Sequence, residues 1–265
     1  MVVTRETGAL PDLPSLFEPV PLREGADALA HAAALAPSRG AGTLPWVRSA
    51  SRVEAAAVLE PELPLRRARI AILAAASAAL DALAAVGPPE LPMQLRWPGT
   101  LTLDGAAAGA VRLLVPDGAA EDAPPPWLAV GVELRLSFPA GTVPGRHPHL
   151  TSLEEQGFED LDAAALTAAW ARHLMATLHD WEAGGFSVLA ERVLARLQPE
   201  DWMDGACPAL DLDTGDLLLD RGAGRGRHAL GVPVLAGAEP PETSPGSASA
   251  SGAGSFPGHP AGARA

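Results

Sequence analysis

Three residue types are absent from the sequence: its 265 residues include no lysine, no asparagine and no tyrosine. All 19 basic residues are therefore arginines, so a site that needs a permanent side-chain cation has to use a guanidinium. Codon bias in a GC-rich genome explains this composition, but the chemical consequence is the same. Cysteine occurs once, at Cys207, which excludes an internal disulfide and fits a reducing cytoplasm.

Positive charge and long apolar runs are also scarce. The formal net charge of -13 predicts that the protein binds neither nucleic acid nor anionic membranes, because both repel an acidic surface. No apolar run approaches the roughly 18 residues that a transmembrane helix needs. Residues 1–6 lack a charged segment followed by an apolar one, so we expect no signal peptide and a cytoplasmic location.

What the sequence does contain is enough apolar residues for one sizeable core and a smaller appendage. Apolar periodicity predicts helices at 25–36 (ended by Pro37), 65–86, 161–182 and 186–197, strands at 44–47, 53–59 and 127–136, and a late hairpin at 210–219 with a further strand within 228–235. This order predicts an α+β fold with a mixed, mainly antiparallel sheet, helices against one of its faces, and a small C-terminal β module. Residues beyond 237 are rich in Pro, Gly, Ser and Ala, which indicates a disordered tail.

The strongest local motif spans residues 96–111. Apolar and β-branched residues flank Asp104-Gly105, and this dipeptide is the strongest short signal for a β-hairpin. The hairpin resembles the central signature of biotin and lipoate protein ligases, which reads Lys-Trp-Pro-Asn-Asp, an apolar strand, a Gly turn, a Lys and Ala-Gly. The matching positions are Trp97, Pro98, Gly105, Ala108 and Gly109, and the resemblance implies that Trp97 lies on a strand that lines the central cleft. Three positions differ, because Gly99-Thr100 replaces Asn-Asp and Ala107 stands at the lysine.

Two further stretches carry the same resemblance. The strand at 127–136 is similar to the ligase strand that ends Gly-Ile-Gly-Ile-Asn, with Gly131 matching and with Glu133 and Arg135 at the second Gly and the Asn. The loop at 38–43 resembles an Arg- and Gly-rich ligase loop that precedes a Trp, here Trp46. In such a loop backbone N–H groups and guanidinium donors bind phosphate or carboxylate. An ordinary turn from helix to strand is the alternative interpretation.

The resemblance implies a ligase domain at 15–200 with a class II synthetase-like core, a β domain at 203–236 and a tail at 237–265. It implies an acyl-adenylate made from ATP and biotin or lipoate, and transfer of the acyl group to a carrier-protein lysine. That chemistry needs a cation at the developing charge and usually a carboxylate for Mg²⁺. Arg112 or Arg39 could replace the lysine missing at Ala107. The expected ligand- and nucleotide-binding residues are Arg39, Gly40, Gly42, Trp46, Arg96, Trp97, Pro98, Asp104, Gly105, Gly109 and Gly131.

Other functions are compatible with the sequence. A catalytically deficient relative would bind biotin, lipoate, a related acid or a carrier domain without adenylating it. Acyl transfer through Cys207 is less favoured, because this residue lies outside the ligase-like region. Arg66, Arg67 and Arg69 form either a solvated basic edge or an anion site. His147 and His149 have no third ligand nearby, so we expect no metal site.

Overall fold

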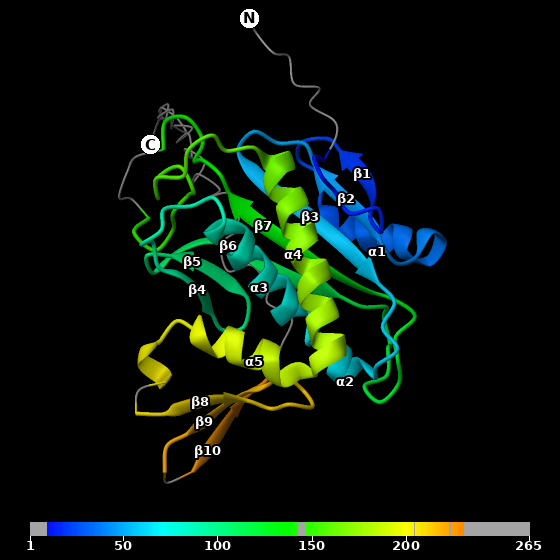
Figure 1. Cartoon of the computed structure of the whole chain (residues 1–265), viewed down its shortest axis with the longest axis vertical. Helices are drawn as coiled ribbons and strands as arrows, with labels where there is room; N and C mark the ends of the chain where they lie inside the picture. The colour runs from blue at the N-terminus through cyan, green and yellow to red at the C-terminus, as the bar shows by residue number, and fades with distance from the viewer. Residues whose placement is uncertain (1–9, 143–146, 204, 223, 231–265) are drawn as a thin grey trace, which may run out of the picture. The chain divides into compact units, whose positions relative to one another are not determined.

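The computed structural model describes residues 10–142, 147–203, 205–222 and 224–230, so the tail predicted at 237–265 lies outside the described residues. Its main sheet has seven strands in the order β1-β2-β3-β7-β6-β5-β4, and β1 and β2 are its parallel pair (Figure 1). The strands are β1 (Glu18–Leu22), β2 (Thr43–Val47), β3 (Arg52–Leu59), β4 (Met93–Arg96), β5 (Thr100–Leu103), β6 (Ala106–Leu114) and β7 (Leu128–Arg135). The predicted mixed, mainly antiparallel sheet is confirmed.

Helices cover both faces of this sheet, whereas we expected them on one. Helices α3 (Ala71–Ala84) and α4 (Ala163–Gly184) pack on the face that holds the large core, and Figure 1 shows them in front of the strands. Helix α1 (Ala28–Arg39) packs on the opposite face over a smaller apolar cluster. Pro37 lies inside α1, so the prediction that it ends this helix is wrong.

The helix predicted over 65–86 is two helices, α2 (Leu65–Ala68) and α3, separated by Arg69 and Ile70. The apolar periodicity runs through this break, which explains why the pattern predicted one helix. Helix α5 (Phe186–Ala195) follows α4 directly, because Gly185 ends α4 with a positive φ of 76°. None of the described helices is long and apolar enough to cross a membrane.

Beyond Glu54, strand β3 is apolar on both of its faces because the sheet is covered on both sides. Val53, Ala55 and Ala57 face the large core, whereas Ala56 and Val58 belong to the cluster beneath α1. Gly131 on the neighbouring strand β7 allows α1 to approach, since a Cβ there would lie 3.3 Å from Leu29 Cδ1. This close packing fixes the position of the α1 N-terminus over the sheet.

The C-terminal β module is a three-stranded antiparallel sheet of β8 (Cys207–Leu210), β9 (Leu217–Asp220) and β10 (Arg225–His228). Its existence is confirmed, but β8 ends where the predicted hairpin begins, and β10 begins earlier than the strand predicted within 228–235. Leu217 and Leu219 belong to the same apolar cluster as Ile70. A domain boundary at residues 200–203 stays a prediction.

Candidate functional site

Strands β3, β7 and β6 present charged side chains on the face that α1 partly covers. Cross-strand pairing places Glu54 opposite Glu133 and Arg52 opposite Arg135. Because residues i and i+2 of a strand share a face, the arginines and the glutamates lie on the same side of the sheet. Arg112 lies on this side too, since it pairs with Gly131, which precedes Glu133 by two residues and therefore shares its face.

A pocket of about 200 Å³ opens on this face at one end of the strands. It is lined by small and charged residues: Ser51, Arg52, Ala108, Gly109, Glu133, Arg135, Ser137 and Pro139. We term this pocket, together with the adjoining Asp27, Glu54 and Arg112, the α1-face cleft. Small residues form its floor and polar side chains surround it, so it can hold a small ligand with hydrogen-bonding groups.

Asp27 joins the first turn of α1 to the sheet. It is the N-cap of the helix, and its carboxylate accepts a hydrogen bond of 2.9 Å from the N–H of Ala30. The same carboxylate makes an ion pair with the Arg112 guanidinium at 3.4 Å. Burial alone would raise the pKa of Asp27, but the Ala30 N–H and the charge of Arg112 outweigh it and hold this pKa below its usual range.

Glu54 is buried beneath the same helix terminus. Its carboxylate accepts a hydrogen bond of 2.9 Å from the N–H of Ala28 and makes an ion pair of 2.8 Å with Arg52. Burial raises the pKa of Glu54, and repulsion from Glu133 and Asp27 adds to the rise, while the Ala28 N–H and Arg52 oppose it. We did not predict Glu54 from the sequence, although a glutamate inside an apolar strand is a signal of a buried polar site.

Arg135 is held by the backbone next to the pocket. Its guanidinium donates hydrogen bonds to the carbonyl oxygens of Thr151 at 2.9 Å and Ala107 at 3.4 Å, and it lies 5.0 Å from the centroid of the Phe138 ring. Burial lowers the pKa of Arg135, and the charges of Glu133 and Glu155 oppose this. The guanidinium nevertheless stays protonated at physiological pH.

Charges of the two signs balance among the described residues of the cleft. Three carboxylates are present, on Asp27, Glu54 and Glu133, and three guanidinium groups, on Arg52, Arg112 and Arg135. Each guanidinium already contacts a carboxylate or carbonyl of the protein. A polyanion entering the cleft would therefore meet no surplus of positive charge from these groups.

The predicted site residues on β6 and β7 lie in or beside this cleft. Gly109 lines the pocket, and a Cβ there would lie 2.0 Å from the carbonyl oxygen of Glu133, so the two strands approach closely at this point. Ala107 is fixed by its backbone, which donates to the His149 carbonyl at 2.8 Å and accepts from the Thr151 N–H at 3.0 Å. Gly131 lies beneath α1.

The predicted site residues of the 96–105 segment lie at two turns, one between β4 and β5 and one between β5 and β6. Asp104 and Gly105 form the predicted turn with positive φ values of 47° and 79°. Arg96 donates to the Gly105 carbonyl at 2.8 Å and pairs with Glu200 at 3.6 Å. Trp97 and Pro98 lie in the turn between β4 and β5, so our expectation that Trp97 lies on a strand is wrong.

Four predicted residues, Arg39, Gly40, Gly42 and Trp46, are not gathered with the rest. The Gly42 N–H donates to the carbonyl of Val58, near the end of β3. The cleft lies at Arg52, the first residue of this strand, which is about 20 Å from Val58 at ~3.3 Å per residue. Arg39 pairs with Glu18 at 3.4 Å, and Gly40 ends α1 with a φ of 74°. Trp46 is buried in the large core on the opposite face of the sheet. The geometry of 38–43 is that of a turn from helix to strand.

The basic cluster on α2 is neutralised by acidic partners. Arg66 and Arg67 both contact Asp213, at 3.3 and 3.4 Å, and Arg69 pairs with Glu121. These pairs favour the interpretation of a basic edge over that of an anion site. Within the part of the chain that the structure describes, no group of three or more His, Cys, Asp or Glu side chains could hold a metal ion.

Comparison with known proteins places the chain in a family. The model of the biotin/lipoate A/B protein ligase family matches residues 13–195, more than half of the sequence. A biotin protein ligase-like protein of unknown function from Silicibacter sp. TM1040 is 27% identical, with a TM-score of 0.70 over 82% of this chain and 96% of that one. No curated protein matches.

Two ligases of known ligands share the fold at lower identity. The biotin protein ligase from Aquifex aeolicus in complex with biotin and ATP is 14% identical, with a TM-score of 0.59 over 79% of this chain and 94% of that one. The Leishmania major ligase in complex with biotinyl-5-AMP is 12% identical, with a TM-score of 0.52 over 82% and 99%. The family match and the shared fold agree with the predicted resemblance, and the chain belongs to the biotin/lipoate A/B protein ligase family.

Proposed function

We propose that this family member binds a small carboxylic acid, biotin, lipoate or a related compound, in the α1-face cleft and does not efficiently form its adenylate. The observation that carries the proposal is that the three arginines of the cleft already have partners within the protein. Arg112 is paired with Asp27, Arg52 with Glu54, and Arg135 with carbonyl oxygens. The lysine position of the family signature is Ala107. A cation is therefore lacking where an acyl-phosphate charge would develop.

The cleft suits a small acid better than an acid and ATP together. Its pocket of about 200 Å³ lies below the roughly 300–1,000 Å³ that is usual for ligand pockets. Ser51, Ser137 and Glu133 offer hydrogen bonds, and Gly109 and Ala108 leave room at the floor. The described residues offer a triphosphate with Mg²⁺ little stabilisation, because the carboxylates of the cleft cancel its guanidinium charges, and the exposed Asp104 belongs to no group of three or more potential metal ligands.

The neighbours that bind biotin and ATP support the acid class of ligand. By the same analogy, an acid held in this cleft would be presented to a carrier-protein domain, and the acidic composition and single cysteine support a cytoplasmic setting. In this proposal the protein acts as a binding partner of the acid or its carrier.

A working ligase with altered residues is the second candidate, and one observation favours it. The ion pair between Asp27 and Arg112 is long, at 3.4 Å, and the Asp27 side chain is half exposed. Arg112 could therefore leave Asp27 for an α-phosphate without a large loss of stability, since exposed pairs contribute about 1 kcal/mol or less. Protein modification that uses ATP and Mg²⁺ would then be retained.

Calorimetric titration with biotin, lipoate and octanoate, each with and without ATP, tests the proposal. We expect at least one acid to bind and ATP to leave its affinity unchanged. Ser51→Trp should close the pocket and abolish binding, whereas Ala50→Trp, an exposed neighbour that does not line it, should not. An acid that binds only with ATP would instead support the ligase, and binding insensitive to Ser51→Trp would contradict the location of the site.

A further inference from the structure

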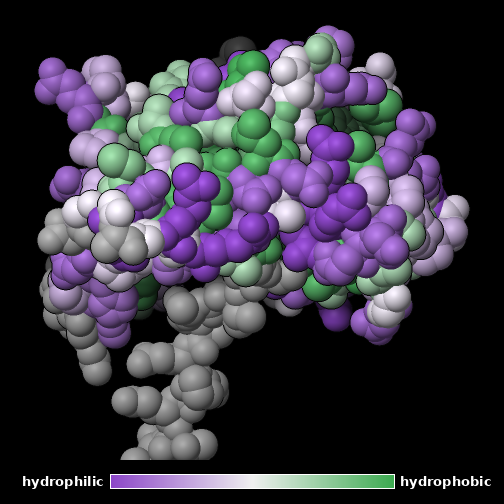
Figure 2. Space-filling view, turned by 90° about the horizontal axis from the view of Figure 1, so that it is seen from below, coloured by the Kyte–Doolittle hydropathy of each residue, from purple (hydrophilic) through white to green (hydrophobic). Residues whose placement is uncertain are grey.

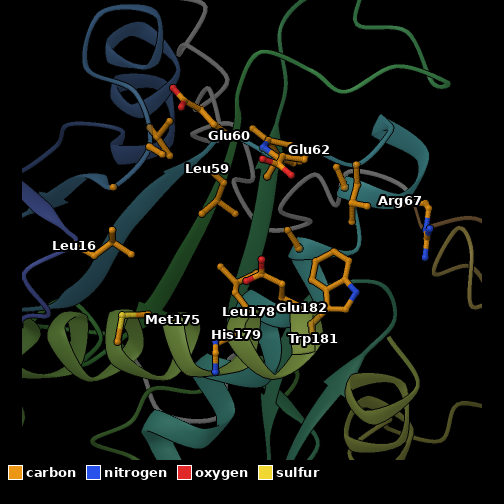
Figure 3. Close-up of a pocket in the computed structure, with 18 of the residues that line it drawn as sticks. Leu16, Leu59, Glu60, Glu62, Arg67, Met175, Leu178, His179, Trp181 and Glu182 are labelled. Atoms are coloured by element: carbon orange, nitrogen blue, oxygen red, sulfur yellow. The ribbon is translucent and has the colours of Figure 1, made fainter. Parts of the chain in front are cut away.

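A second and larger pocket lies at the other end of the strands from the α1-face cleft. It has a volume of about 810 Å³, within the range of pockets that hold small molecules. Residues that precede β1 and β2, the end of β3 with the loop after it, and residues of α2 and α4 line it, and none of them belongs to the cleft. Figure 3 shows its wall of apolar side chains, among them Leu59, Leu178 and Trp181.

Helix α4 supplies one wall because its apolar stripe continues past the core. Met175, Leu178 and Trp181 recur at intervals of three residues and so lie on one side of the helix. Met175 is 37% exposed and Leu16, on the facing segment, is 67% exposed, which is a high exposure for large apolar residues. Figure 2, which views the molecule of Figure 1 from below, shows patches of apolar surface among hydrophilic residues on that side.

The polar groups of this pocket are mainly acidic. Glu60, Glu62 and Glu182 line it, and among the described residues none of them has an ion-pair or hydrogen-bond partner. Figure 3 shows Glu62 and Glu182 pointing into the same space from opposite walls. Arg67, the guanidinium of the lining, points away in this view and pairs with Asp213. Acidic groups beside an apolar wall favour a ligand with a cationic head.

We propose that this pocket is a binding site for a small amphiphile with an aliphatic chain and a cationic head group. The chain would lie along Leu59, Leu178 and Trp181, and the head would lie between Glu62 and Glu182. The site is independent of the function proposed for the cleft, because the two pockets share no residue. Its failure would leave that function unaffected.

Calorimetric titration of the full chain with octyltrimethylammonium, and with octyl sulfate as the anion of equal chain length, tests this proposal. We expect the cation to bind at least about tenfold more tightly than the anion. Met175→Trp should fill the pocket and abolish binding, whereas Ala176→Trp, an exposed neighbour on α4 that does not line it, should leave binding unchanged. Equal binding of the two probes, or binding unaffected by Met175→Trp, would overturn the proposal.

A second pair of variants tests the role of charge. Replacing Glu62 and Glu182 together by Gln should weaken the cation about tenfold and reduce the salt dependence of binding. The matched control is Glu90→Gln with Glu191→Gln, two exposed glutamates outside the pocket. Equal weakening in both double variants would overturn the assignment to this pocket. A dimer in sedimentation that Met175→Trp dissociates would overturn it too, since a second copy would then cover the site.

Discussion

Glu54 and Glu133 lie directly opposite each other on strands β3 and β7, on the face of the sheet that α1 partly covers. Two carboxylates in this relationship repel each other, and the repulsion adds to the effect of burial on the pKa of Glu54. The arginines that flank them at Arg52 and Arg135 limit the cost. This arrangement makes the cleft polar but leaves it without surplus positive charge.

Glu54→Gln should change the pH dependence of stability. The folded-state pKa of Glu54 is raised above its ordinary value of 4.5, so between these two values the folded protein binds more protons than the unfolded chain. Wild-type stability should therefore fall relative to the variant as the pH rises from 4.5 through the raised pKa. Urea denaturation of both proteins from pH 4.5 to 7.5 measures this. If the stability of wild type relative to the variant instead rose with pH, the ion pair with Arg52 would be the dominant effect.

Asp27→Ala should lower the free energy of unfolding by about 1 kcal/mol, because it removes the N-cap of α1. Asp27→Asn is the matched control, since asparagine also caps helices but carries no charge. Chemical denaturation at neutral pH should show a smaller loss for Asn than for Ala. Because the pKa of Asp27 is lowered, the advantage of wild type over Asn should disappear as the pH falls below 3.8 through that pKa. Equal losses at neutral pH would mean that the charge, not the cap, stabilises the helix.

Local signals in the sequence predicted local structure well. The Asp104-Gly105 turn was predictable because Asp and Gly tolerate the positive φ that both residues adopt here. Strands β3 and β7 were predictable from their apolar runs. The Arg39 loop could not be placed correctly, since its position depends on the bond from Gly42 to Val58, a pairing that local sequence does not encode. The juxtaposition of Glu54 with Glu133 and of Arg52 with Arg135 likewise depends on cross-strand register.

Gly109→Ala should destabilise the protein by about 3 kcal/mol or more, because its Cβ would lie 2.0 Å from a backbone oxygen that cannot move freely. Gly105→Ala is the control in the same hairpin. Its φ of 79° disfavours alanine, but no atom lies within 4 Å of the new Cβ, so we expect a cost of about 1–2 kcal/mol. Thermal denaturation compares the two. Equal costs would contradict the role of Gly109 in strand packing.

Ala107→Lys should increase acid-dependent pyrophosphate release, since it places a cation at the lysine position of the family signature. Restoring a stabilising group at a developing charge is worth up to about 10²–10³ in rate. Ala106→Lys is the control, because neighbouring residues on a strand point to opposite faces. No increase in Ala107→Lys, or an equal increase in both variants, would show that a missing cation at this position is not what limits the reaction.

Whether the wild-type protein forms an acyl-adenylate is decided by its pyrophosphate release, measured with ATP, Mg²⁺ and each of biotin, lipoate and octanoate. Arg39→Ala and Arg112→Ala are measured beside it, because Arg39 lies at the far end of the sheet and Arg112 in the cleft. We expect release at the background rate for all three proteins. Sustained acid-dependent release by wild type that is lost in Arg112→Ala and retained in Arg39→Ala would contradict this expectation and assign the missing cation to Arg112.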